Sequence, residues 1–286
     1  MLSACVVNWN TRDDLRVCLG SLGAHPYTGP GGQELIVVDN ASSDGSAEMV
    51  ARDFPEARLL ANDANTGYTR ATNQALAAAQ GDLLLLLNPD VEITPGALDT
   101  LARQLSDAAA IAPRLVHPDG RLQRSIRGFP EPGPLFWDIL GLSRVFPNSR
   151  RFGAYRRTFF DYDRPGPAPQ PMTSCLLVAR RAYEAVGPLD ERFPLFFSDV
   201  DWCLRAWRTG WEIRYTPDAT VVHQGGASTR LVRTAAIRES HRALLRFYDK
   251  HYKKHIPRPL YALIRAAVTL GAWARTRRWG QKRDHA

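Results

Sequence analysis

The sequence is short of cysteine and lysine, and it lacks long apolar runs. None of its four cysteines belongs to a CxxC pair or a zinc-ligand pattern; they are Cys5, Cys18, Cys175 and Cys203. Cysteine in apolar surroundings acts as a small hydrophobe, which fits a reducing compartment. The chain begins Met1-Leu2-Ser3 without the basic region of a signal peptide, so none is expected. No segment has the ~20 apolar residues that a membrane-spanning helix needs.

Repeats, low-complexity tracts and a GxGxxG turn after the first predicted strand are also missing. Without that turn, a dinucleotide-dependent oxidoreductase on a similar sheet is disfavoured. What is present is a chain of 286 residues with 44% hydrophobic content. That length suffices for one large α/β domain and an appendage.

The basic charge is concentrated at one end of the chain. All four lysines lie in residues 230–286, which carry a net charge of +12, whereas the first 229 residues carry −4. A mildly acidic body with a basic tail predicts a domain held near a polyanion, either anionic lipid or nucleic acid. Aromatic residues lie among these bases, but no nucleic-acid-binding motif is present. We therefore expect an anionic membrane surface as the partner and no nucleic acid.

Within this basic tail, residues 260–273 are mostly apolar and are interrupted by Arg265. The stretch is too short to span a bilayer. Because arginines flank it on both sides, it is typical of an amphipathic helix lying at a membrane interface. A helix packed on the protein body explains the same pattern equally well.

Apolar runs alternate with helical patterns through the first 90 residues. Strands are predicted to end near residues 7, 38, 60 and 87, with helices over 13–22, 47–53 and 69–79. This alternation is typical of an α/β fold with a mostly parallel, doubly wound sheet. Ligands bind such sheets beyond the carboxyl ends of the strands. Polar clusters follow three of these ends, at 8–11, 39–46 and 88–90, and they predict a binding site.

The middle of the chain is less regular. Residues 114–171 are rich in Pro, Gly, Arg and aromatics, and they predict loops over the sheet that suit acceptor recognition. A strand is predicted over 175–178, and helices over 181–186 and 199–209. Two short strands are then predicted, at 213–215 and 220–222.

Two candidate residues follow strands, and each also has an ordinary structural explanation. Asp39 begins the turn toward Ser42, so it either forms an Asx turn or binds a base or ribose. Asp90 either caps the helix near Pro95 or holds a metal. Thr94 matches an N-cap before proline better, which favours the metal role for Asp90.

Three further candidates lie near the end of the predicted domain. Asp199 and Asp201 begin a helix, where acids complement the helix dipole. The largely aromatic segment 193–197, which precedes these acids, would place a carboxylate beside apolar surface. Such surroundings shift the proton affinity of a carboxylate. His223 precedes two glycines, a pattern that suggests close backbone approach, although a lone histidine is commonly structural.

Taken in order, the motifs resemble the family 2 glycosyltransferases with the GT-A fold, in a branch similar to rhamnosyltransferases. The resemblance covers residues 3–229, about four fifths of the chain. Each motif is weak alone, but eight in this order form a specific signature. They are VVNWN (6–10), IVVDNASSDGS (36–46), NTGYTRATNQ (65–74), LLLLNPDVEI (84–93), RLVHPDGRLQRSIR (114–127), SCLLVARR (174–181), VGPLDERFPLFFSDVDWCLRAWRTGW (186–211) and VVHQGGAS (221–228).

The resemblance implies an inverting transfer of a sugar from a nucleotide diphosphate, with Mg²⁺ or Mn²⁺ as cofactor. Asp90 and His223 match the metal positions, and Asp199 matches the base that deprotonates the acceptor hydroxyl. Asp201 and Arg205 match supporting neighbours. Residues matching the nucleotide-sugar pocket are Asn8, Asn10, Asp39, Asn40, Ser42, Asp44, Asn65, Gly67, Tyr68, Asn73 and Asn88.

The sequence departs from the family pattern at two positions. Asn88 replaces the first acid of the DxD motif and lowers the charge around the metal. Ser198 replaces a glutamate that often precedes the base, so Asp201 stays an alternative to Asp199 as base.

The resemblance predicts a domain organisation and a location. Residues 1–229 form the GT-A domain, with a nucleotide-sugar-binding half at 1–112 and an acceptor-binding and catalytic half at 113–229, followed by a basic helical tail at 230–286. The branch implies dTDP-L-rhamnose as donor, with a UDP-sugar as alternative, and a saccharide or lipid-linked saccharide as acceptor. The tail then favours a cytoplasmic protein peripheral to the plasma membrane. The rival interpretation is a non-catalytic nucleotide-sugar-binding protein of the same fold.

Overall fold

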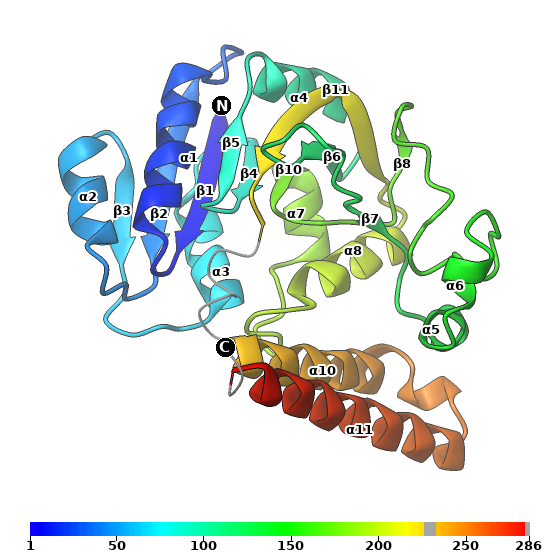
Figure 1. Cartoon of the computed structure of the whole chain (residues 1–286). Coiled ribbons are helices and arrows are strands. Elements are labelled where there is room, and N and C mark those ends of the chain that lie inside the picture. Colours follow the sequence, from blue (N-terminus) through cyan, green and yellow to red (C-terminus); the bar gives the residue numbers. More distant parts are fainter. Residues whose placement is uncertain (226–232, 284–286) are drawn as a thin grey trace.

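The structure is a computed structural model that describes residues 1–225 and 233–283. The end of the 221–228 motif and the predicted boundary after residue 229 therefore lie outside the described residues. A mixed sheet forms the centre and helices cover both of its faces (Figure 1). The strands are β1 (Leu2–Asn8), β2 (Gln33–Asp39), β3 (Arg58–Ala61), β4 (Leu83–Leu87), β5 (Val91–Ile93), β6 (Ala110–Val116), β7 (Ile126–Arg127), β8 (Gly166–Pro167), β9 (Gln170–Pro171), β10 (Cys175–Ala179) and β11 (Ile213–His223). The helices are α1 (Arg12–Ala24), α2 (Ser46–Asp53), α3 (Tyr68–Ala78), α4 (Ala97–Leu105), α5 (Pro132–Ile139), α6 (Leu142–Val145), α7 (Arg180–Val186), α8 (Ser198–Arg208), α10 (Arg233–His251), the 3₁₀ turn η1 (Lys253–His255) and α11 (Arg258–Arg283).

The first half of the sheet is parallel, as the alternation of strands and helices predicts. Its strand order is β3-β2-β1-β4, and every neighbouring pair is parallel. Right-handed crossovers place α1 and α2 on one face and α3 on the other. All five residues of β4 are leucine and four of them are buried, as expected for a central strand covered on both faces.

The second half of the sheet is mixed. β10 lies between β4 and β6 and is antiparallel to both, while β11 is parallel to β6 and antiparallel to β5 and β8. The predicted boundary between the two halves, after residue 112, falls inside β6. The residues before and after this boundary therefore share one sheet and one core.

Several predicted element boundaries need correction. β5 and β6 were not predicted, and the two short strands predicted at 213–215 and 220–222 are one strand, β11, with a register irregularity between Thr216 and Thr220. Thr94 does not cap α4; its hydroxyl donates to the Thr220 carbonyl at 2.6 Å, and Gly96 occupies the N-cap position with φ 72°. Thr11 stands at the N-cap of α1 without a side-chain capping bond.

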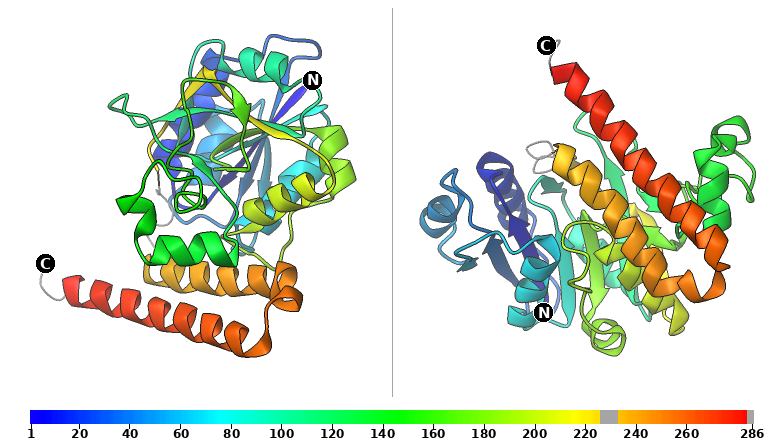
Figure 2. Two further views of the ribbon diagram at one scale, coloured as in Figure 1. Left: turned by 90° about the vertical axis from the view of Figure 1, so that its right-hand side faces the viewer. Right: turned by 90° about the horizontal axis from the view of Figure 1, so that it is seen from below.

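The tail forms a helical hairpin, α10–α11, on the side to which the carboxyl ends of β1 and β2 point (Figure 1). α10 packs on the body through Phe247 and Tyr248, which join a buried cluster with Phe193 and Leu204. α11 lies against α10 and its far end extends past the body (Figure 2). Within 1–225 and 233–283, every helix is too short or too polar to cross a bilayer.

Candidate active site

The polar clusters after β1 and β2 are locked together by Asp39. Its Oδ1 accepts a hydrogen bond from Asn8 Nδ2 at 2.8 Å, and its Oδ2 accepts one from the Ser42 backbone N–H at 2.9 Å. The Ser42 hydroxyl accepts from the backbone N–H of Asn10 at 2.9 Å. The Asp39–Ser42 bond reaches the residue three positions on, one further than in the Asx turn that the sequence suggests. Both carboxylate oxygens of Asp39 are thus used within the loop, and the residue is 2% exposed.

Neighbouring residues extend this network to the next loops. Asn10, at φ 52°, accepts the Ser43 N–H at 2.7 Å, and Asp44 accepts the Arg12 N–H at 2.9 Å. Asn40 donates to Asn65 Oδ1 at 3.0 Å. The structure therefore brings together most residues predicted for the nucleotide pocket, in loops that follow β1, β2 and β3.

Gly67 brings the loop before α3 against the segment that precedes α8. A Cβ on Gly67 would meet the Pro194 carbonyl oxygen at 2.9 Å, and the backbone there has φ 85°. Asn73 binds the same region, because its amide donates to the Leu189 carbonyl at 2.9 Å and its Oδ1 accepts the Leu189 N–H at 3.1 Å. Asn73 thus connects α3 to the chain near Leu189, and its position gives no support to a part in nucleotide binding.

A cavity of about 260 Å³ opens where these loops meet the beginning of α8. Tyr68, Asn88 and Asp90 line it, and so does Asp199. The other lining residues are Val7, Pro89, Met172, Thr173, Ser174, Leu195, Phe196, Phe197 and Ser198. Candidate metal and base residues that are more than 100 positions apart in sequence therefore share one cavity.

The pairing of β5 with β11 places His223 beside Asp90. His223 is opposite Val91 in the antiparallel register, and the Gln224 N–H donates to the Asp90 carbonyl at 3.1 Å. The His223 Nε2 atom lies 3.3 Å from Asp90 Oδ1, with both side chains at least 95% buried. The two residues predicted as metal ligands are thus brought together.

Gln123, which was not predicted as a site residue, orients the His223 ring of this pair. Its Oε1 lies 2.7 Å from His223 Nδ1, so that nitrogen carries the proton. The buried Nε2 lies toward the Asp90 carboxylate and has no hydrogen-bond partner among the described residues. A cation held between the two side chains would give both of them a partner. A histidine oriented by a second hydrogen bond is the usual arrangement of a metal ligand.

The Asp90–His223 pair therefore fits a divalent cation, but it supplies only two ligands. No group of three or more His, Cys, Asp or Glu side chains converges on a metal position anywhere in the described part of the chain. Mg²⁺ commonly binds through one or two protein ligands, with substrate phosphates and water completing the shell. The donor set suits a metal that arrives with a diphosphate.

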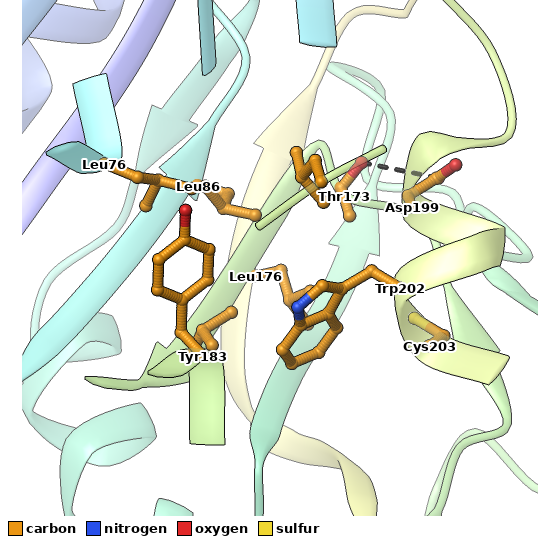
Figure 3. A pocket seen from close by; sticks show the side chains of 10 residues that line it. Leu76, Leu86, Thr173, Leu176, Tyr183, Asp199, Trp202 and Cys203 are labelled. Carbon is orange, nitrogen blue, oxygen red and sulfur yellow. Dashed lines mark hydrogen bonds between the residues drawn. The ribbon is translucent and has the colours of Figure 1, made fainter. Parts of the chain in front are cut away.

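Asp199 lines the same cavity from the beginning of α8. Its Oδ2 accepts from the Thr173 hydroxyl at 3.4 Å and its Oδ1 accepts from the Val200 N–H at 2.8 Å. Figure 3 shows Asp199 next to Thr173 at the edge of a small pocket, which the apolar side chains of Leu176 and Trp202 also line. Burial raises the pKa of Asp199, although these hydrogen bonds oppose the shift.

Tyr68 shares the electrostatic environment of Asp199. Burial, and then the negative charge of Asp199, raise the pKa of the Tyr68 phenol to about 12. Tyr68 therefore stays protonated at neutral pH and can donate a hydrogen bond into the cavity.

Asp201 and Arg205, predicted beside Asp199 in the catalytic group, do not line this cavity. Asp201 is fully buried, and its carboxylate binds Arg205 at 2.9 Å, Lys250 at 2.5 Å and His251 at 2.7 Å. Burial opposes ionisation, but these three partners lower the pKa of Asp201. Arg205 also donates to the Pro188 carbonyl at 2.7 Å. A carboxylate held by three donors is a structural anion and a poor proton acceptor.

The cavity is thus lined by Asp90, which with His223 forms a pair suited to a metal, and by Asp199, a carboxylate with raised proton affinity. The first can neutralise the charge of a departing diphosphate, and the second can accept a proton from a hydroxyl. This combination suits transfer of a group from a nucleotide diphosphate to an alcohol.

Comparison with known proteins agrees with this chemistry. Residues 3–163 match the family described as Glycosyl transferase family 2. The N-acetylglucosaminyl-diphospho-decaprenol L-rhamnosyltransferase of Mycobacterium tuberculosis is 30% identical over 256 residues, which cover 82% of this chain and 81% of that protein. The low-salt glycan biosynthesis hexosyltransferase Agl10 of Haloferax volcanii is 22% identical over 228 residues, covering 78% of this chain and 66% of that protein.

Solved structures share the fold. The mannosyltransferase PcManGT of Pyrobaculum calidifontis, solved with GDP-Man and Mn²⁺, superposes with a TM-score of 0.57 at 16% identity, covering 95% of this chain and 69% of that one. S. aureus TarS 1–349, solved with UDP, gives 0.55 at 14% identity, covering 85% and 65%. The predicted GT-A fold is confirmed, and the chain belongs to glycosyltransferase family 2.

Proposed function

We propose that this protein is a metal-dependent, inverting glycosyltransferase. One observation carries the proposal: Asp90, next to His223, and Asp199 face a single cavity at the carboxyl ends of the parallel strands. We further propose that residues 1–112 bind the nucleotide sugar, that residues 113–229 bind the acceptor and carry the base, and that residues 230–286 form the basic tail.

The donor would lie along the polar loops after β1, β2 and β3. Asp39 and Asn8 fix the loop against which the base and ribose would bind, and Tyr68 and Asn88 are positioned to donate hydrogen bonds to the sugar or diphosphate. A divalent cation held by Asp90 and His223 would stabilise the charge that develops on the diphosphate.

Asp199 would act as the general base. Its carboxylate takes the proton of the acceptor hydroxyl while that oxygen forms a bond to the sugar's C1. The bond from C1 to the diphosphate oxygen breaks with its electron pair, and the nucleoside diphosphate leaves. Attack from the face opposite the leaving group inverts the anomeric carbon.

dTDP-L-rhamnose is the favoured donor and a lipid-linked saccharide is the favoured acceptor. The support comes from the relative that transfers L-rhamnose to a diphospho-decaprenol-linked sugar. The exposed face of α11 supports an acceptor at a membrane, because Leu263 and Leu270 are 67% and 64% exposed beside basic residues. We propose a cytoplasmic enzyme, peripheral at the inner face of the plasma membrane.

A thermal-shift screen of nucleotide diphosphates and nucleotide sugars, with and without Mn²⁺ or Mg²⁺, tests the donor. A ligand that binds only the folded state raises Tm by mass action. We expect a metal-dependent rise with dTDP-L-rhamnose, and loss of the metal dependence in Gln123→Ala, which frees the His223 ring. A rise with UDP-sugars alone would reassign the donor, and no rise with any nucleotide would contradict the proposal.

A turnover assay separates the enzyme from a binding protein of the same fold. Release of dTDP from dTDP-L-rhamnose, with a polyprenyl diphosphate-linked N-acetylglucosamine as acceptor, is the expected result. Metal-dependent nucleotide binding without turnover for any acceptor tested would favour the non-catalytic alternative.

A further inference from the structure

Lys250, in the last turn of α10, ties together both ends of the segment that carries Asp199. Its Nζ lies 2.7 Å from Asp190 Oδ2 and 2.5 Å from Asp201 Oδ1. The ammonium group also lies 5.8 Å from the centre of the Phe193 ring. The Lys250 side chain thus links the two ends of the segment 190–201. Residues 195–199 of this segment line the cavity.

The partners of Lys250 are themselves held firmly. Arg192 binds Asp190 at 2.6 Å, and His251 binds Asp201 at 2.7 Å while its Nδ1 lies 2.8 Å from an Arg208 nitrogen. Because the Arg208 guanidinium only donates, His251 Nδ1 accepts, and Nε2–H donates to Asp201. The charged groups around the buried Asp201 carboxylate are therefore all paired. Because each group depends on its neighbours for a partner, the cluster resists rearrangement.

A second contact from α10 reaches the other flank of Asp199. Phe197 lies two residues before Asp199, lines the cavity, and has φ 73°, a left-handed conformation that is strained for a bulky residue. Its ring packs on that of the fully buried Phe247, with centroids 5.6 Å apart. A strained backbone conformation persists where the surrounding structure holds it in place. Here the packing of Phe247 on the Phe197 ring holds the backbone of Phe197.

We propose that α10 is a positioning element of the active site. Phe247 fixes the residue two positions before Asp199, while Lys250 and His251 fix the residue two positions after it. Among the described residues, the carboxylate of Asp199 makes two hydrogen bonds, to Thr173 and Val200, so its place on the cavity wall depends on these flanks. The inference rests on the proposed role of Asp199 as base and adds that three residues of α10, Phe247, Lys250 and His251, position that base.

The test compares kcat and the donor KM of full-length variants in the dTDP-release assay. For Lys250→Met and for Phe247→Leu we expect kcat to fall by at least about tenfold, the scale on which small displacements of reacting groups act. The donor KM should stay within about twofold, since the donor loops lie in the other half of the domain. Lys250→Arg, which keeps the charge, should recover most of the kcat.

Lys253→Met is the matched control. This lysine follows α10, pairs with Asp249 at 3.3 Å, and has a side chain that is 58% exposed. Its removal should leave kcat and KM unchanged. If Lys250→Met fails to fold because Asp201 is left short of a partner, Phe247→Leu still tests α10 through the other flank of Asp199, without a change of charge.

The outcomes separate this inference from the proposed function. Folded Lys250→Met and Phe247→Leu with normal kcat would overturn the positioning role, while an inactive Asp199→Asn in the same assay would keep the base in place. Near-normal kcat in Asp199→Asn would overturn the base itself. Equal losses of kcat in Lys250→Met and Lys253→Met would also contradict the proposal, since they indicate a general effect of charge on the tail.

Discussion

Asp199 lies between two different environments. Its protonation state affects both its action as a base and the stability of the fold. The open cavity is on one side, and the apolar pocket with Leu176 and Trp202 is on the other. Burial raises the pKa of this carboxyl above its ordinary value. A base with raised proton affinity is better matched to neutral pH, but the folded protein must hold an anion that is poorly solvated.

Asp199→Asn should therefore abolish transfer and raise Tm at pH 7. A carboxyl whose pKa is higher in the folded state contributes full stability below its unfolded pKa of ~3.9, and that contribution is lost as pH rises through the folded pKa. The neutral amide avoids this loss. The measurement is Tm of both proteins from pH 4 to pH 8, and we expect the gap to widen as pH rises. A variant less stable than wild type at pH 8 would contradict the burial argument.

For single residues, the sequence predicted the candidate metal and base residues better than it predicted the side chains that contact them. Asp90, His223 and Asp199 lie in short motifs and were predicted from them. Gln123 contacts His223, which lies 100 positions later in the chain. The sequence around either residue gives no sign of this contact. Asp201 looked catalytic because it lies beside Asp199, whereas its surroundings are set by a helix 50 positions away.

At the scale of elements, the turn before α3 depends on a glycine for two independent reasons. Gly67 has φ 85°, which L residues rarely adopt, and a Cβ there would lie 2.9 Å from the Pro194 carbonyl oxygen. The Thr69 N–H donates to the same oxygen at 3.2 Å. This contact sets the spacing between the nucleotide half and the segment that leads to Asp199.

Gly67→Ala should destabilise the protein by about 1–3 kcal/mol and also lower kcat, because the segment before α8 must move. Gly120→Ala is the matched control, since Gly120 has φ 79° but open space where a Cβ would lie. Urea unfolding and the dTDP-release assay give the two readouts. Loss of stability in both variants with loss of kcat only in Gly67→Ala is expected, and equal kcat in the two would show that the Pro194 contact does not matter.

Element prediction worked where local pattern and tertiary structure agree. The parallel strands β1, β2 and β4 are apolar runs with clear ends, and they were found within two residues. β11 was divided in two because Pro217 and Asp218 interrupt it, and the strand passes this point by a shift of register. β5 has only three residues, too few for a period to be seen in the sequence.

At the scale of the molecule, the tail combines the two arrangements that its sequence left open. Both alternatives concerned residues 260–273, which lie in α11: this helix buries Tyr261 in the cluster through which α10 packs on the body, and it also presents exposed apolar side chains. Leu260, Leu263, Leu270 and Trp273 are each about half or more exposed, and Arg277 stacks on Trp273 at 4.0 Å. The sequence pattern alone did not separate the roles of the two helices, because both are basic.

Leu263→Glu combined with Leu270→Glu should release the protein from anionic vesicles, since both side chains are exposed and would meet lipid on the outer face of α11. Cosedimentation with vesicles that contain phosphatidylserine measures the binding, and neutral phosphatidylcholine vesicles give the reference. Folding and donor binding should be unaffected, because neither leucine belongs to a buried cluster. Unchanged sedimentation of the double variant would remove α11 as the membrane contact.

The Lys250 bridge between Asp190 and Asp201 has a consequence for how such proteins diverge. A chimera that takes its tail from a relative must inherit matching partners for the buried Asp201, or it leaves that anion with Arg205 in place of three partners. Positions 190, 201, 250 and 251 should therefore vary as a set among relatives whose tail folds back in this way. Where the acid at position 201 is replaced, the two basic residues should be replaced with it.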